Sequence, residues 1–322
     1  MDDTLLEIRN LSVEYHTDDD VIYAVNNVSL AIRKGETIGL VGETGAGKTT
    51  IAKSIMRILP MLQAHIVSGE IRFEDRDILK LSEREMRKIR GNKIAMIFQD
   101  PMTALNPIEK VGYQITEAIK QHNKIKRVEA ERRACDMLEM VGIPMDRFDE
   151  YPHQFSGGMK QRVVIAMALA CKPELLLADE PTTALDVTIQ AQVLDMMRSL
   201  KEKLGTSVVL ITHDLGVVAE FCDMVAVAYA GEIVERGTAR HIFKHPAHPY
   251  TLGLFGSLPK LNSTERRLKP IKGLMPDPTI KYEGCRFRDR CPEATNSCTE
   301  SAPPEIEVSP GHYAKCALVA SG

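Results

Sequence analysis

The chain of 322 residues carries 41 Lys and Arg against 44 Asp and Glu, with a formal net charge of -3 and a pI near 6.3. This balance excludes the overall basic excess of proteins that coat nucleic acid. The longest nearly unbroken apolar run, residues 163–171, is about half of the roughly 18 residues that span a bilayer. The acidic N-terminus, with no apolar segment after it, predicts a cytosolic protein.

The first 40 residues alternate apolar and polar side chains, which predicts half-buried strands. A short apolar run at 37–41 then leads through glycines into a predicted helix at 50–59. Farther on, a helix over 189–200 lies between two more buried strands, 175–178 and 208–212. Buried strands that alternate with helices predict a parallel sheet covered on both faces.

The remaining segments complete this outline. A strand is predicted at 94–98, a helical subdomain over 109–141 and a closing hairpin over 225–234. After about Gly237, frequent prolines interrupt any long helix, so the last 80 or so residues are predicted to form a separate unit.

A phosphate-binding loop is predicted between the strand 37–41 and the helix that follows. Residues 42–49 fit the pattern G-x-x-x-x-G-K-[ST], in which backbone N–H groups and a helix N-terminus meet phosphate oxygens. Lys48 is expected to reach the β- and γ-phosphates and Thr49 to bind Mg²⁺. The predicted nucleotide-binding residues here are Gly42, Glu43, Thr44, Gly45, Ala46, Gly47, Lys48, Thr49 and Thr50.

Two adjacent carboxylates end the buried strand at 175–178. Asp179 is placed to hold the Mg²⁺ shell, and Glu180 to polarise a water for attack on the γ-phosphate. The pair favours hydrolysis over transfer to a bulky acceptor.

A second anion site is predicted where Ser156, Gly157 and Gly158 begin an apolar helix. Together with the phosphate loop, this segment resembles the signature motif of the ATP-binding cassette (ABC) family. Phe155 and Met159 depart from the commoner Leu and Gln, as in the peptide-importer branch. The resemblance implies a head-to-tail dimer in which Ser156 and Gly158 of one cassette close over the phosphates held by Lys48 of the other.

Other cassette motifs follow in order over residues 6–237. Gln99 resembles the Q-loop glutamine, which touches the metal and the attacking water, and residues 184–186 resemble the D-loop with Asp186. His213 resembles the switch histidine that contacts the γ-phosphate. Tyr15 resembles the aromatic that stacks on adenine, and Tyr23 is a rival for that role.

Two features resemble the dipeptide and oligopeptide (and nickel) importer ATPases in particular. They are the Leu-Asn-Pro element after Gln99 and the sequence His-Pro-Ala-His-Pro-Tyr-Thr at 245–251. The implied α/β fold is a P-loop NTPase cassette with a RecA-like parallel sheet core, an antiparallel β subdomain and a helical subdomain at about 100–160. The expected domains are a nucleotide-binding domain at 1–237 and a small Cys-rich domain at 238–322.

Four of the seven cysteines gather in this last segment, at the spacing C-x5-C-x6-C-x17-C. The spacing lacks the C-x2-C pairs common in structural zinc sites, and four cysteines suit an iron–sulfur cluster. The resemblance implies a [4Fe-4S] cluster, with zinc or unbound thiols as alternatives. Because a small, proline-rich unit with few large apolar residues needs a cross-link to hold its fold, we expect a structural role. The expected ligands are Cys285, Cys291, Cys298 and Cys316.

The resemblance implies an ATPase motor subunit of a bacterial peptide importer, peripheral on the cytoplasmic face of the membrane, with ATP and Mg²⁺. Its expected partners are two permease subunits, a second ABC subunit, and, indirectly, an extracytoplasmic peptide-binding protein. For the second ABC subunit the resemblance favours a different chain over a second copy of this one; nucleic acid is not expected. The alternatives are a nickel or other small-solute importer of the same branch and a soluble, non-transport ABC ATPase. One phosphate loop and no heptad run oppose the soluble enzyme. A regulatory module without turnover is opposed by Glu180 and His213.

Overall fold

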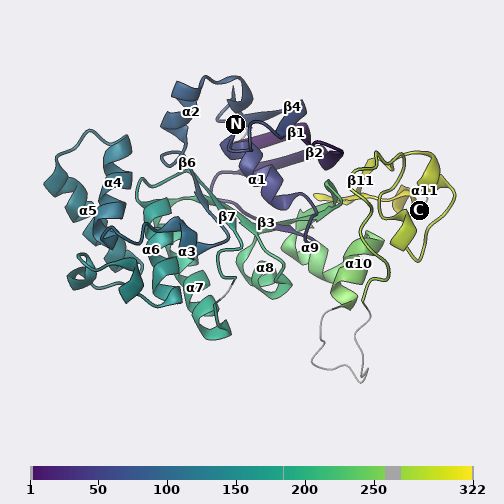
Figure 1. Ribbon diagram of the computed structural model, residues 1–322. Coiled ribbons are helices and arrows are strands. Elements are labelled where there is room, and N and C mark those ends of the chain that lie inside the picture. Colours follow the sequence, from purple (N-terminus) through teal and green to yellow (C-terminus); the bar gives the residue numbers. More distant parts are fainter. Residues whose placement is uncertain (1–2, 184, 258–269, 321–322) are drawn as a thin grey trace. The chain divides into compact units, whose positions relative to one another are not determined.

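The computed structural model describes residues 3–183, 185–257 and 270–320 (Figure 1). The chain divides into two compact units. The first unit comprises Met1–Leu6, Ile32–Thr37 and Phe73–Thr212, and the second comprises Glu7–Ala31, Ile38–Arg72 and His213–Gly322. This division does not follow the expected boundary at residue 237, so the two-domain description stays a prediction. Ala184, in the expected D-loop, lies outside the described residues.

The sheet of the first unit is parallel, as the buried apolar runs predict. The central strand β7 (Leu175–Asp179) pairs with β6 (Ile94–Ile97) on one side and β8 (Ser207–Ile211) on the other. Every residue of the three strands is buried. Because such a sheet is covered on both faces, polar side chains that bind ligands are expected at the ends of its strands.

Helices of the first unit form the predicted helical region, in which α4 packs on α5 and both pack on α6. Besides the three strands of its sheet, the first unit contains the elements β5 (Arg76–Asp77), η1 (Ile78–Lys80), α2 (Glu83–Ile89), α3 (Pro101–Ala104), α4 (Val111–His122), α5 (Arg127–Met140), η2 (Met145–Arg147), η3 (Pro152–Gln154), α6 (Gly157–Leu169) and α7 (Val187–Leu204).

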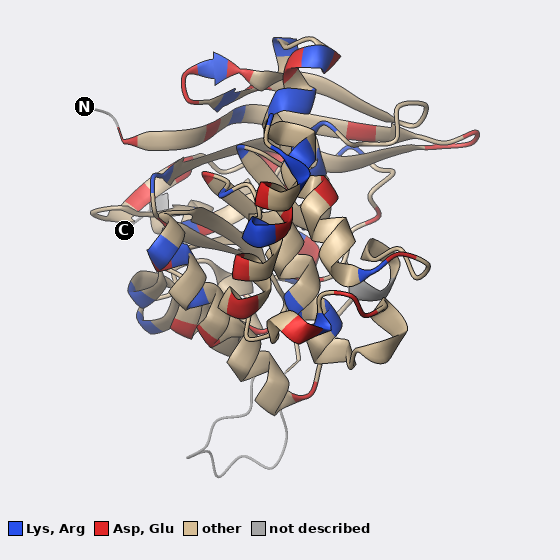
Figure 2. Cartoon of the chain, turned by 90° about the vertical axis from the view of Figure 1, so that its left-hand side faces the viewer, with Lys and Arg blue, Asp and Glu red and all other residues tan. Residues whose placement is uncertain are grey.

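The exposed face of α5 is lined with charges of both signs, and red and blue segments alternate on the helices of this side (Figure 2). Glu129 accepts hydrogen bonds from Arg132 and Arg133, which lower its carboxyl pKa to about 2. Arg127 pairs with Glu131 at 2.7 Å. Such pairs at a spacing of three or four residues stabilise an exposed helix only weakly, because water screens them.

The sheet of the second unit begins parallel and ends antiparallel. β3 (Thr37–Val41) pairs in parallel with β9 (Met224–Tyr229), which forms the predicted hairpin with β10 (Glu232–Thr238). The strand β12 (His312–Lys315) then pairs with β10, and β11 (Glu305–Ser309) with β12. The C-terminal segment therefore extends the same sheet that carries the phosphate loop.

The other elements of the second unit, with the strands whose greater part lies in it, are β1 (Thr4–His16), β2 (Val21–Arg33), α1 (Lys48–Met56), β4 (Ala64–Phe73), α8 (Leu215–Phe221), α9 (Ala239–Lys244), α10 (Pro249–Gly256), η4 (Arg288–Arg290), α11 (Ser297–Glu300) and α12 (Ala317–Ala320). In the parts of the chain that the structure describes, no helix is long and apolar enough to cross a bilayer.

Candidate nucleotide site

The phosphate loop (residues 42–49) joins β3 to α1, and two of its glycines are required by close backbone contacts. Gly42 has φ 149°, and a Cβ there would lie 2.0 Å from the Ala228 carbonyl oxygen. Gly47 has φ 91°, and a Cβ there would lie 2.4 Å from the Ala24 carbonyl oxygen. Only glycine fits at these positions without displacing a neighbouring strand.

Helix α1 begins at the end of this loop, with Gly47 as its N-cap. Gly47 has no side chain that could accept hydrogen bonds from the first-turn N–H groups of α1, and an anion can accept such bonds at a helix N-terminus. The Lys48 ammonium donates to the carbonyl oxygens of Gly42 and Glu43, at 2.7 and 2.8 Å. This fold-back keeps the buried cation within the loop that phosphates would enter.

The two aromatic candidates for adenine stacking differ in their surroundings. The Tyr15 hydroxyl lies 3.3 Å from the Thr50 hydroxyl, on the first turn of α1. Tyr23 instead joins the C-terminal segment, because its N–H donates to the Pro278 carbonyl at 2.8 Å. The contact with α1 favours Tyr15.

The first unit carries the two carboxylates at the end of β7. Asp179 is the last residue of the strand and is buried, and Glu180 follows in the left-handed region at φ 48°. Its N–H donates to the Ile211 carbonyl at 2.8 Å, which holds this unusual backbone. The carboxylate accepts from Gln99 Nε2 at 3.0 Å and from the Thr183 hydroxyl at 2.9 Å. The structure thus brings the predicted Q-loop glutamine to the predicted base.

The signature segment caps α6. The Ser156 hydroxyl accepts from the Met159 N–H at 3.4 Å. A Cβ at Gly157 would meet nothing within 4 Å, whereas one at Gly158 would lie 2.6 Å from the Ile189 side chain on α7. Gly157 therefore leaves open space, and Gly158 permits close helix packing.

The two departures from the commoner motif share one partner, which sequence reasoning missed. The Arg147 guanidinium lies 4.5 Å from the centre of the Phe155 ring and donates to the Met159 sulfur at 3.3 Å. Phe155 and Met159 thus both pack against the Arg147 guanidinium.

Two further predicted residues lie at element ends. Asp186 caps α7 by accepting from the Ile189 N–H at 3.0 Å. His213 is exposed and follows β8 in the chain; it belongs to the second unit.

The four C-terminal cysteines lie in one neighbourhood. Burial raises the pKa of the Cys285 thiol to about 11, and the charges of Cys298, Cys316 and Cys291 raise it as well. Among the described residues, no three His, Cys, Asp or Glu side chains converge closely enough to hold a metal ion. The thiols are thus near one another without forming a closed ligand set.

Comparison of the sequence with those of known proteins identifies the family. The chain is 50% identical to the probable peptide ABC transporter ATP-binding protein y4tR of Sinorhizobium fredii, over 98% of this chain and 95% of the relative. It is 51% identical to the oligopeptide transport ATP-binding protein OppD of Bacillus subtilis, over 98% and 89%. The chain belongs to the ABC transporter ATP-binding family.

Two family profiles match this ABC protein along its length. Residues 25–183 match the ABC transporter profile, and residues 234–298 match the oligopeptide/dipeptide transporter C-terminal region. The first range contains the phosphate loop, the signature segment and both carboxylates. The resemblance read from the motifs is therefore confirmed.

Solved structures confirm the cassette fold. A dimeric post-hydrolysis ATP-binding cassette bound to ADP and Pi matches with a TM-score of 0.66 and 29% identity, over 73% of this chain and 99% of that one. A component of the ABC transporter complex cbiONQ from Clostridium perfringens matches with a TM-score of 0.65 and 27% identity, over 76% and 92%. The expected P-loop NTPase cassette is correct.

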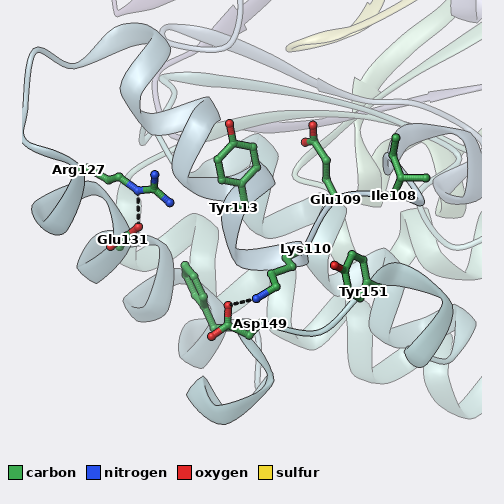
Figure 3. Close-up of a pocket in the computed structure, with 9 residues that line it drawn as sticks. Ile108, Glu109, Lys110, Tyr113, Arg127, Glu131, Asp149 and Tyr151 are labelled. Carbon is green, nitrogen blue, oxygen red and sulfur yellow. Dashed lines mark hydrogen bonds and ion pairs between the residues drawn. The ribbon is translucent and has the colours of Figure 1, made fainter.

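A pocket of about 320 Å³ opens on the helical part of the first unit (Figure 3). Ion pairs join Lys110 to Asp149 at 2.8 Å and Arg127 to Glu131 at 2.7 Å. The residues that line it are Ile108, Glu109, Lys110, Tyr113, Arg127, Glu131, Phe148, Asp149 and Tyr151.

Proposed function

We propose that this ABC protein is the ATP-hydrolysing subunit of a peptide importer. The observation that carries the proposal is the hydrogen bond between Gln99 and Glu180, in a chain whose phosphate loop leads into the N-terminus of α1. The relatives named above are peptide and oligopeptide transport ATP-binding proteins, which favours peptides over nickel as the cargo.

The reaction assigns a separate task to each group. The phosphate loop and Lys48 bind the triphosphate of the substrate MgATP, Thr49 and Asp179 would hold its Mg²⁺, and Tyr15 stacks on adenine. Glu180 accepts the proton of the attacking water, and Gln99 orients that water. His213 contacts the γ-phosphate.

A second ABC subunit completes the site in this proposal. Ser156 is exposed and a Cβ at Gly157 would meet nothing within 4 Å, so a partner's nucleotide can reach the α6 N-terminus. Asp186 would cross to the partner. Two sites that close only around ATP couple hydrolysis to opening and closing, which permeases at the cytoplasmic face of the membrane can use.

Glu180→Gln tests the reaction directly. The amide cannot accept the proton, so ATP turnover should fall by at least about 100-fold while MgATP binding persists. Purified wild type, Glu180→Gln and Lys48→Ala are compared by phosphate release, nucleotide binding and size-exclusion chromatography. Glu180→Gln should form an ATP-dependent dimer, and Lys48→Ala should bind no ATP. Turnover by Glu180→Gln at the wild-type rate would refute the base assignment.

We also propose that the four C-terminal cysteines hold a [4Fe-4S] cluster. Four soft thiols whose charges act on one another fit this group better than an oxygen-preferring metal. When bound, the cluster would supply cross-links that stabilise the proline-rich segment. Cys285, Cys291, Cys298 and Cys316 would be its ligands.

Metal analysis separates the alternatives for the cysteines. Anaerobically purified protein should contain about four iron and four sulfide per chain, whereas a zinc site would give zinc without sulfide, and unbound thiols neither. Cys298→Ser should lose the iron. Cys222→Ser is the matched control, because Cys222 and Cys298 are similarly buried, 7% and 8% exposed, and it should keep the iron. Iron-free wild-type protein would contradict the proposal.

A further inference from the structure

Glu43 in the phosphate loop is held by two residues from the C-terminal part of the second unit. Its N–H donates to the Tyr250 hydroxyl at 3.0 Å. Its carboxylate accepts two bonds from the Arg290 guanidinium, at 2.8 and 3.2 Å. Residues more than 200 positions away thus grip both the backbone and the side chain of one loop residue.

Tyr250 is rigidly placed. It lies in the first turn of α10 and is fully buried, with its ring 4.5 Å from Tyr229 and 5.4 Å from Phe287, centre to centre. Burial raises the pKa of the Tyr250 hydroxyl, so the group stays neutral and can accept the loop N–H. The aromatic cluster fixes the oxygen that meets Glu43.

Arg290 is equally constrained. It ends the short helix η4, and its Nε donates to the Lys272 carbonyl at 3.2 Å. Its guanidinium also lies 3.4 Å from the Tyr229 hydroxyl, and its side chain is only 7% exposed. A bidentate ion pair whose guanidinium is buried has a defined geometry that a fully exposed pair lacks.

We propose that Tyr250 and Arg290 are positioning residues of the nucleotide site, through which the C-terminal segment sets ATP affinity. The inference rests on the proposed nucleotide function. Both backbone polar groups of Glu43 are held, because its carbonyl oxygen accepts from the Lys48 ammonium and its N–H donates to the Tyr250 hydroxyl. This arrangement keeps the loop in the shape that receives phosphates and lowers the entropy lost on binding.

Arg290 also acts through charge. The phosphate loop itself carries the Glu43 carboxylate, and like charges repel at short range. Arg290 neutralises that carboxylate. Without it, Glu43 would oppose ATP, so removing the Glu43 charge as well should restore much of the lost affinity.

The test measures the MgATP dissociation constant, KM and kcat of the full-length variants. Arg290→Gln should weaken binding about tenfold and Tyr250→Phe about fivefold, with kcat at saturating ATP near the wild-type value. Arg290→Gln combined with Glu43→Gln should bind within about threefold of wild type. A change in KM alone, rescued by the second substitution, is not expected from a residue that only stabilises the fold.

Arg286→Gln is the matched control. Arg286 lies four positions before Arg290 and its side chain is also 7% exposed, but it pairs with Glu232, outside the loop, at 2.8 Å. It should lower the melting temperature and leave ATP affinity unchanged. The proposal is overturned if Arg290→Gln binds like wild type, if Arg286→Gln weakens ATP as much, or if the double variant regains nothing. A folded wild-type chain that binds no MgATP would overturn the proposed function as well.

Discussion

His248 is a buried histidine with a single fitting tautomer. Its Nδ1 accepts from the Tyr250 N–H at 3.0 Å, and it also bonds the backbone of Lys315, which requires the proton on Nε2. Its own N–H donates to the Glu235 carboxylate at 2.9 Å, and that carboxylate also meets His312 at 2.7 Å. A second proton on the ring would break the bond that caps α10.

This arrangement predicts a loss of stability in acid. Burial lowers the His248 pKa to about 4, below the value near 6.5 of an unfolded chain. Because the unfolded chain binds the proton more readily, the contribution of His248 is complete above about pH 6.5 and is lost as the pH falls towards 4, by up to roughly 3 kcal/mol.

Chemical denaturation between pH 4 and 7 measures this effect. His248→Asn keeps an acceptor for the Tyr250 N–H but cannot titrate, so its stability should depend less on pH. His245→Asn, at an exposed position nearby, should retain the wild-type dependence. Identical pH profiles for wild type and His248→Asn would refute the assignment.

At the scale of elements, docking of the expected permease can be tested at the pocket on the first unit. Ile108 at its rim is 81% exposed, beside the aromatic rings of Tyr113, Phe148 and Tyr151 and several paired charges. Protein–protein interfaces are enriched in aromatic side chains relative to the rest of the surface. We propose that a cytoplasmic helix of the permease binds there.

Ile108→Asp should therefore reduce co-purification of the permease subunits at least about tenfold and leave ATP turnover of the isolated subunit unchanged. Val128→Asp is the matched control, since Val128 is 77% exposed on α5 and does not line the pocket. Equal co-purification of the two variants would exclude the pocket as the docking site.

Element types were well predicted where local patterns are strong, and boundaries less so. The run 37–41 is strand β3 as expected, because continuous burial leaves no choice of face. The helix predicted at 50–59 is α1, Lys48–Met56. It begins earlier than predicted because Gly47 is its N-cap, and it ends earlier because Arg57 adopts the left-handed conformation at φ 50°. An arginine does not indicate this backbone conformation in the sequence, because glycine and asparagine are the residues that usually adopt it.

At the scale of the whole chain, the sequence motifs identify the chemistry but not the contacts that support it. In the sequence the segment 245–251 marks only the branch of the family, yet its Tyr250 hydroxyl accepts a hydrogen bond from the phosphate loop. The pairing of Arg290 with Glu43, like that of Arg147 with Met159, joins residues by tertiary packing. No local periodicity encodes such pairs, so only a structure reveals them.

The central claim is that ATP hydrolysis at Glu180 drives peptide import. Its most direct test is uptake of labelled dipeptide, pentapeptide and nickel by cells that lack this chain, complemented with wild type or Glu180→Gln. We expect uptake of a peptide to fail without the chain, to return with wild type, and to remain absent with Glu180→Gln. Unchanged peptide uptake in the cells without the chain, or full rescue by Glu180→Gln, would contradict the account.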